Sequence, residues 1–311
     1  FAPAEVEVIR TALDFAAPLY AERRLASGEE VLTHALETAR ILLDLRLDHE
    51  TLAAALLFRC HEIAADTARP LREKFGTTIA DLSEGVVRMA QIDALSSRRQ
   101  PAQKPEQHAA QLEVLRKMLL AMVQDVRIVL IKLADHAQEL RYVVRIDNDP
   151  LRRGVAELTR DIFSPLANRL GVWQLKWELA DLAFRILEAD TYKRIARLLD
   201  EKRAYRERYI GGVIAVLKGE LARAGIASEV TGRPKHIFSI YKKMEIKGID
   251  FESLYDVRAV RILVDDVKDC YAALGLVHNL WSPIPKEFDD YIARPKRNNY
   301  RSLHTAVIGP E

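Results

Sequence analysis

The stretch Gly232–Met244 reads GRPKHIFSIYKKM. Its glycine and proline predict a turn after a strand, and the apolar residues that follow His236 recur at helical spacing. Backbone N–H groups at a helix start bind anions, and flanking cations strengthen that attraction. We therefore predict a strand, a basic turn and a helix that cradle a polyphosphate, although a solvated basic helix end would also explain the charge. Five basic residues lie within fifteen positions: Arg233, Lys235, Lys242, Lys243 and Lys247.

Two features support a nucleotide site. Ser239 and Lys243 are four positions apart and would share one face of the predicted helix. Downstream, Asp256 precedes the apolar run Val257–Val264, which predicts a buried strand. A carboxylate at a strand end beside phosphates is a common Mg²⁺ ligand, but aspartate before a strand is also ordinary turn chemistry.

The segment Pro285–Thr305 mixes acids, bases and aromatic residues. It contains Glu287, Asp289 and Asp290 together with five basic residues, Tyr291, Tyr300 and His304. Such a mixture suits a metal ion, a phosphate and a stacked base. A solvated charged loop explains the same composition about equally well.

Composition sets the limits of these interpretations. A chain of 311 residues with 49% hydrophobic and 30% charged residues is typical of a globular protein with two domains. The net charge of +2 gives no global field, so a local anion site is favoured over a general nucleic-acid surface. Two distant cysteines fit a reducing cytoplasm, and no apolar run is long enough to span a membrane.

The two halves of the chain differ in their periodicity. Residues 1 to about 200 have apolar residues at helical spacing, whereas the remainder alternates short apolar runs with helical segments. Neither GxxxxGK[ST] nor GxGxxG occurs, so no P-loop or dinucleotide fingerprint is present. We predict an all-helical domain, residues 1–158, a helical linker, residues 159–200, and an α+β domain, residues 201–311.

Four segments carry a resemblance to a known family: GRPKHIFSIYKKM, LYDVRAVRI, EFDDYIARPKRNNYRSLHT and SPLANRLGVWQLKWELADLAFR. They resemble the RelA/SpoT family of guanosine tetraphosphate enzymes and occur in the family's order. The resemblance implies Mg²⁺-dependent transfer of pyrophosphate from ATP to the 3′-hydroxyl of GDP or GTP. It also implies a nucleotidyltransferase-like mixed sheet for residues 201–311, and ribosome and tRNA partners bound through C-terminal domains outside this sequence.

The helical half resembles the family's hydrolase domain, an HD-type fold. There a His, a His-Asp pair and a distant Asp hold Mn²⁺. The resemblance assigns His34 to the first His and Asp135 to the distant Asp, but Phe58 and Arg59 stand at the His-Asp pair. Phenylalanine has no donor atom and arginine is a cation, so neither ligates a metal. We therefore expect no catalytic Mn²⁺ and no hydrolase activity.

Neighbouring residues support this expectation. The family's Glu-Asp pair falls on Glu62 and Ile63, so half of it is lost. His61 lies three positions after the expected histidine, about 300° around a helix, and need not face His34. We interpret His34, His61 and Asp135 as structural groups with satisfied hydrogen bonds.

In the synthetase half, the resemblance assigns a role to each residue. Asp256 is the Mg²⁺ ligand, and Arg261 and His304 join it as catalytic residues. Of Arg258 and Arg261, which point to opposite faces of a strand, the resemblance favours Arg261. ATP is bound by Arg233, Lys235, Ser239 and Lys243. The guanine nucleotide is bound by Lys296, Asn298, Tyr300 and His304, with Tyr300 stacked on the base.

Two departures and two alternatives remain. Active members carry a catalytic Glu on a strand after the SLHT segment, and this sequence ends at Glu311 before that motif. The acidic EFDD segment, Glu287–Asp290, resembles synthetase-only members. A catalytically silent scaffold that binds RNA or the ribosome would also use the basic cluster, and a nucleotidyltransferase with another acceptor would share the fold.

Overall fold

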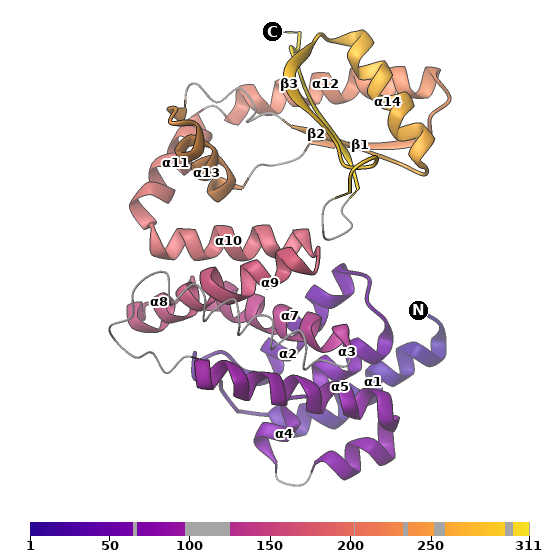
Figure 1. Cartoon of the computed structure of the whole chain (residues 1–311). Coiled ribbons are helices and arrows are strands. Elements are labelled where there is room, and N and C mark those ends of the chain that lie inside the picture. The colour runs from indigo at the N-terminus through magenta and orange to yellow at the C-terminus, as the bar shows by residue number, and fades with distance from the viewer. Residues whose placement is uncertain are drawn as a thin grey trace. The chain divides into compact units, whose positions relative to one another are not determined.

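The computed structural model describes residues 1–64, 67–96, 125–201, 203–232, 236–251, 259–295 and 301–310. The chain divides into two compact units, which are described separately (Figure 1). The first unit comprises residues 1–168 and 172–187, and the second comprises residues 169–171 and 188–311. The predicted linker, residues 159–200, is divided between them, and the functional limits of the domains stay a prediction.

The described part of the first unit is built from helices (Figure 1). Helix α5 is interrupted at Gly76, where φ is +81°. The elements are α1 (Pro3–Tyr20), α2 (Val31–Asp44), α3 (His49–Leu57), α4 (Cys60–Ile63), α5 (Ala68–Ser96), α7 (Val126–Val143), α8 (Asp149–Leu158), the π-helix η1 (Thr159–Phe163), α9 (Ser164–Arg169) and α10 (Trp173–Leu187).

Helix α3 is the centre of this unit. Its residues Thr51–Leu57 are all buried, so it has no solvent face of the kind that surface helices keep. The Asp48 side chain caps its first turn by accepting a hydrogen bond from the Thr51 N–H at 2.8 Å. Helix α3 packs against α1, α2, α5 and α7. The residues that follow its last turn, Phe58 and Arg59, are therefore held inside the helical layer.

The second unit combines helices with two pairs of strands (Figure 1). Strand β1 pairs with β2, and β3 pairs with β4. Both pairs are antiparallel, whereas the predicted mixed sheet also includes parallel pairs. The elements are α11 (Ala189–Glu201), α12 (Arg203–Arg223), β1 (Ser228–Gly232), α13 (Ile237–Lys247), β2 (Val260–Val264), α14 (Val267–Leu280), β3 (Pro283–Asp290) and β4 (Leu303–Val307).

Two apolar cores hold this unit together. Residues of α12, β1 and α14 form the larger core, against which Ile262 and Val264 of β2 pack. The smaller core joins Ile195 of α11, Ile240 of α13 and Phe251. Each core uses one apolar face of a helix, as helical spacing predicts.

The predicted fold class, a helical part followed by an α+β part, is confirmed. Helix α14 is one of the helical segments that alternate with apolar runs in this half, and Gly225 follows α12 with φ +71°. Strand β3 is not predicted from the sequence, because the mixed charges of its segment suit a ligand site and a solvated loop about equally. Within the described residues, no helix has the length and apolar composition of a membrane span.

Candidate functional site

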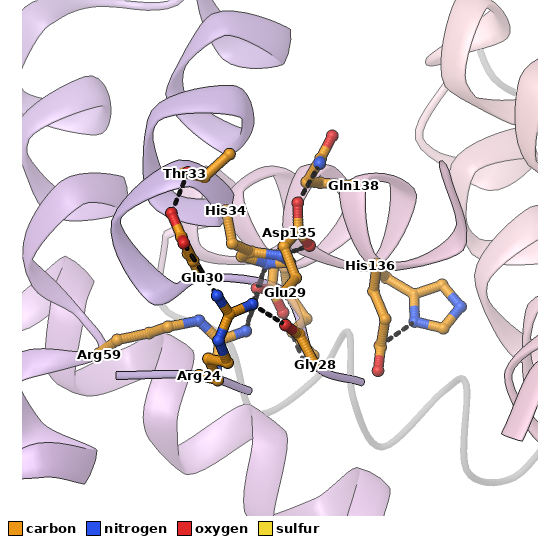
Figure 2. Close-up of polar contacts among 12 residues, drawn as sticks. Arg24, Gly28, Glu29, Glu30, Thr33, His34, Arg59, Asp135, His136 and Gln138 are labelled. Carbon is orange, nitrogen blue, oxygen red and sulfur yellow. Dashed lines mark hydrogen bonds and ion pairs between the residues drawn. The ribbon is translucent and has the colours of Figure 1, made fainter. Parts of the chain in front are cut away.

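His34 lies at the centre of a buried polar cluster in the first unit (Figure 2). Its Nδ1 lies 2.7 Å from Glu29 Oε2, and its Nε2 lies 2.8 Å from Asp135 Oδ1. Ionised carboxylates only accept hydrogen bonds, so both ring nitrogens donate and the ring is an imidazolium. Burial opposes this charge, but the hydrogen bonds to Asp135 and Glu29 outweigh it and raise the pKa of His34.

Arg59 extends from the end of α3 into the same cluster (Figure 2). Its Nη2 donates to Asp135 Oδ1 at 2.5 Å, and its Nη1 donates to Glu62 Oε2 at 3.0 Å. The same Nη2 lies 3.4 Å from His34 Nε2. Burial opposes the guanidinium charge, but the charges of Asp135 and Glu62 raise the pKa of Arg59. The predicted metal-pair position therefore carries a fixed cation.

Asp135, on α7, is surrounded by cationic donors. Its Oδ1 accepts from His34 and Arg59, and its Oδ2 lies 3.0 Å from Lys132 Nζ. Burial would raise the pKa of this carboxyl group, but Arg59, Lys132 and His34 together hold it well below its ordinary value. Asp135 is thus a carboxylate whose two oxygens are both engaged.

The other residues expected at this site do not supply metal ligands. Phe58 is 2% exposed, and its ring centroid lies 4.9 Å from Arg59 Cζ. His61 contacts Thr67 Oγ1 at 3.0 Å and Ser83 Oγ at 3.1 Å. Its hydrogen-bond partners are therefore these two hydroxyl groups.

These groups do not fit the divalent cation that the resemblance implies. Two ligands on one cation, each at about 2.1 Å, are about 3.0–3.4 Å apart and direct lone pairs at it. His34 Nε2 and Asp135 Oδ1 are only 2.8 Å apart, and the ring nitrogen donates a hydrogen bond to the carboxylate instead. Among the described residues, no group of three His, Cys, Asp or Glu side chains is suited to a metal ion.

A cavity of about 420 Å³ adjoins Arg59. Among the described residues, its lining includes the guanidinium groups of Arg23, Arg24 and Arg59 and the carboxylate of Glu62. Guanidinium groups repel a divalent cation. The cavity beside the cluster is therefore as unfavourable for a divalent cation as the cluster itself.

The sequence did not reveal the partners that complete the cluster. Gln138 Nε2 donates to Glu29 Oε1 at 2.6 Å, and both residues are buried. They are 109 positions apart, so no local pattern connects them. His136 lies to one side of the cluster (Figure 2). Its ring stacks on Phe163 with ring centroids 3.8 Å apart.

In the second unit, Ser239 and Lys243 both lie on α13, one helical turn apart. Ile240 is buried in the core that α13 forms with α11, and Ser239 and Lys243 are half-buried beside it. The helix begins after His236, whose backbone is extended and whose side chain makes no capping hydrogen bond. This structure agrees with a shared face for Ser239 and Lys243, and their contact with ATP stays a prediction.

Arg261 is on β2, opposite Thr231 of β1. Its strand neighbours Ile262 and Val264 pack on the larger core, while Arg261 is exposed. Because side chains alternate along a strand, Arg261 lies on the face away from that core. It is therefore accessible to a ligand.

His304 lies on β4, opposite Asp289 of β3. Its ring meets that of Tyr291 edge to face, with centroids 5.3 Å apart. The next residue, Thr305, accepts or donates a 2.8 Å hydrogen bond with His278 of α14. Since alternate residues of a strand face opposite ways, His304 and Asp289 share the face away from α14.

Asp290, the last residue of the acidic EFDD segment, has a defined set of hydrogen bonds. The Asp290 carboxylate accepts from the N–H groups of Ala293 and Ile292 at 2.8 and 2.9 Å and from the Tyr271 hydroxyl at 3.0 Å. The Ala293 hydrogen bond is foremost among the causes that lower the pKa of Asp290. Asp290 therefore holds a turn, which the sequence alone did not indicate.

Six predicted site residues lie outside the described residues. They include the predicted metal ligand Asp256 and the predicted stacking residue Tyr300. The others are Arg233, Lys235, Lys296 and Asn298.

Comparison with known families identifies both halves. Residues 12–173 match a model described as "HD domain", which covers most of the first unit. Residues 232–311 match a model described as "Region found in RelA / SpoT proteins". The first half is therefore an HD domain. The second half contains the region found in RelA/SpoT proteins.

Similar proteins bear one common name. Those named GTP pyrophosphokinase from Photobacterium angustum and Escherichia coli are both 46% identical, over 285 and 280 residues. These alignments cover 92% and 90% of this chain and 38% and 37% of those proteins. One of the same name from Myxococcus xanthus is 39% identical over 306 residues, or 98% of this chain and 39% of its own. The chain thus spans less than half the length of these relatives.

Proposed function

We propose that this chain is the catalytic part of an enzyme that transfers pyrophosphate from ATP to the 3′-hydroxyl of GDP or GTP. The observation that carries the proposal is the match of residues 232–311 to the RelA/SpoT region. That region contains the turn, helix and strands on which the predicted nucleotide-binding residues lie. The name shared by the similar proteins, GTP pyrophosphokinase, supports the same reaction.

The residues of the second unit suit this chemistry. Transfer between phosphates needs charge neutralisation and alignment more than covalent catalysis. Ser239 and Lys243 would hold ATP phosphates from α13, together with Arg233 and Lys235. Arg261, on the exposed face of β2, would neutralise charge on the moving group.

The acceptor would bind beside β4. His304 would hold its phosphates or ribose, Tyr300 would stack on guanine, and Lys296 and Asn298 would make polar contacts. Asp256 supplies a carboxylate of the type that Mg²⁺ prefers. A bound Mg²⁺ would neutralise the phosphate oxygens and orient them.

We further propose that the HD domain does not hydrolyse guanosine tetraphosphate. The supporting observation is the ion pair of Arg59 with Asp135 at 2.5 Å, which engages a carboxylate that the hydrolase reaction needs for metal. Incubation with guanosine tetraphosphate and Mn²⁺ should release no pyrophosphate. Release above that of a heat-inactivated sample would contradict this part of the proposal.

The reaction is tested with ATP labelled in its γ-phosphate and with unlabelled GDP. Pyrophosphate transfer moves the label to a guanosine tetraphosphate and leaves AMP. A nucleotidyltransferase with another acceptor would release labelled pyrophosphate instead, and a silent scaffold would leave ATP unchanged. We expect the first outcome in the presence of Mg²⁺. The same proposal places the enzyme in the cytoplasm, with ribosome and tRNA as partners of the longer protein.

A further inference from the structure

We propose that the guanidinium of Arg59 is the permanent cation of the HD domain. It stands in the place of a metal ion, so that this domain folds without metal. The proposal concerns the first unit and does not depend on pyrophosphate transfer by the second. It rests on the charge balance, the geometry and the burial of one cluster.

The first argument is charge balance. The groups joined by ion pairs in this cluster are three carboxylates, from Glu29, Glu62 and Asp135, and three basic groups, from His34, Arg59 and Lys132. The neighbouring Glu139 carboxylate also attracts Arg59, but its ion-pair partner is His136 at 3.5 Å. Three negative and three positive charges sum to zero. Buried carboxylates without compensating charge are strongly unfavourable. Without Arg59, one negative charge in this cluster would lack a counter-charge.

The second argument is geometry. The two Nη atoms of Arg59 bridge two carboxylates, those of Asp135 and Glu62, as a cation bound between them would. A planar guanidinium supplies this fork in a fixed shape, whereas the ammonium of lysine is a single point of charge. The Phe58 ring, 4.9 Å from Arg59 Cζ, supports the guanidinium on an apolar surface. Phe58 and Arg59 thus act together where the family has a His-Asp pair.

The third argument is burial. The side chain of Arg59 is 13% exposed and that of Asp135 is 3% exposed. Exposed ion pairs contribute about 0–1 kcal/mol, but removal of one partner from a buried pair is far more costly. Arg72 offers a matched comparison in the same unit, because it also bridges two carboxylates, Asp81 and Glu84, yet its side chain is 40% exposed.

Hydrogen exchange of the α3 and α7 amides reads the stability of this domain alone, so metal or nucleotide bound to the other unit does not enter the measurement. We expect Arg59→Ala to lower the folding equilibrium constant by several hundredfold or more. Arg72→Ala should lower it about fivefold or less. Equal losses in the two variants, or no loss in Arg59→Ala, would overturn the proposal.

Chemical rescue tests whether a cation is what the site needs. Millimolar guanidinium chloride should restore protection to Arg59→Ala but not to Arg72→Ala, and equal concentrations of urea or sodium chloride should have no such effect. Rescue by urea as well as by guanidinium would indicate filling of space rather than charge, and would overturn the proposal.

Two further measurements cover the case in which Arg59→Ala does not fold. The double variant Arg59→Ala/Asp135→Asn should fold better than Arg59→Ala, because it removes one negative charge and restores the balance of charges in the cluster. A double variant no better than the single would contradict the proposal. In the unmodified protein, EDTA and Mn²⁺ should leave exchange of α3 and α7 unchanged, and a response to either would show that the domain uses a metal.

Discussion

Replacement of Lys243 by alanine tests the predicted ATP cradle on α13. This helix packs on α11 through Ile240 and its apolar neighbours. Lys243 is one helical turn from Ser239, beside that packed face. The substitution keeps the apolar contacts and removes one ammonium group. We therefore expect Lys243→Ala to fold normally and to bind ATP weakly.

The magnitude follows from the loss of one charge-assisted hydrogen bond, which contributes about 1.5–3 kcal/mol. That free energy corresponds to about ten- to a hundredfold in affinity or rate. The adjacent Lys242 is the matched control, because it is exposed and its ammonium lies 5.6 Å from the Phe238 ring centroid. One residue along a helix turns the side chain by about 100°. Lys242→Ala should therefore retain affinity within about twofold, the change typical of a surface substitution.

The assay is a titration of each variant with a non-hydrolysable ATP analogue, alongside the initial rate of label transfer from ATP to GDP. A thermal melt of each variant verifies the fold. If both lysine variants lose affinity equally, the attraction is a general basic surface and the cradle is refuted. An unchanged affinity in Lys243→Ala would remove this residue from the site.

Four further variants test other parts of the chain. Asp256→Asn should abolish Mg²⁺-dependent transfer with little effect on metal-free ATP binding. Tyr300→Ala should weaken the binding of GDP by about 1–3 kcal/mol. GDP and ATP titrations of each variant check both expectations, and an equal loss of affinity for both nucleotides with a lowered melting point would contradict them. Phe58→Ala should lower the free energy of unfolding by about 3–5 kcal/mol because Phe58 is buried, and a loss below about 1 kcal/mol by urea denaturation would show a pliable site. Asp48→Ala should cost about 1 kcal/mol at neutral pH. Burial raises the pKa of Asp48, but hydrogen bonds from Thr51 lower it more, so this stabilisation is present above the carboxyl group's ordinary pKa of 3.8 and is lost as pH falls through the lower folded value. A difference between variant and parent that does not shrink as pH falls below that ordinary value would refute the assignment.

Elements with local signals were predictable from sequence. Strand β1 ends at Gly232, the glycine of the predicted turn, and α13 begins at Ile237 after the proline. Helix α14 begins after Asp266, whose side chain accepts a 2.8 Å hydrogen bond from the Asp269 N–H. Turns and caps are decided by a few adjacent residues, so their signals survive without tertiary contacts.

Strand β3 could not be predicted in the same way. Its sequence PIPKEFDD contains two prolines and three acids, which are rare in strands. Lys286 has a positive φ of 66°, and the register with β4 shifts between Pro283 and Phe288. The segment adopts an extended conformation because it pairs with β4. This partner strand lies further along the chain, after a turn and a charged segment, so no local signal reveals the pairing. Pairing of this kind overrides local preference.

The charged cluster of the HD domain was half predictable. With the positions that the family resemblance assigns, the residue types of Phe58 and Arg59 predict that a metal pair is missing. The ion pair of Arg59 with Asp135 joins positions 76 apart, and that of His34 with Asp135 joins positions 101 apart. The expected loss of the metal pair follows from residue chemistry, but the group that we propose in place of the metal could be named only from the assembled helices α2, α3 and α7.

The two units, taken with the proposals, treat cations in opposite ways. In the HD domain the cations are side chains, and both oxygens of Asp135 accept hydrogen bonds from Arg59, His34 and Lys132. These cations are covalent parts of the chain, so they do not leave the site and are not exchanged for dissolved metal ions. In the second unit, Asp256 would hold an ion that exchanges with solvent and arrives with the nucleotide. Divalent-cation dependence would then belong to pyrophosphate transfer alone, and a chelator would stop the reaction while α3 and α7 kept their protection from hydrogen exchange.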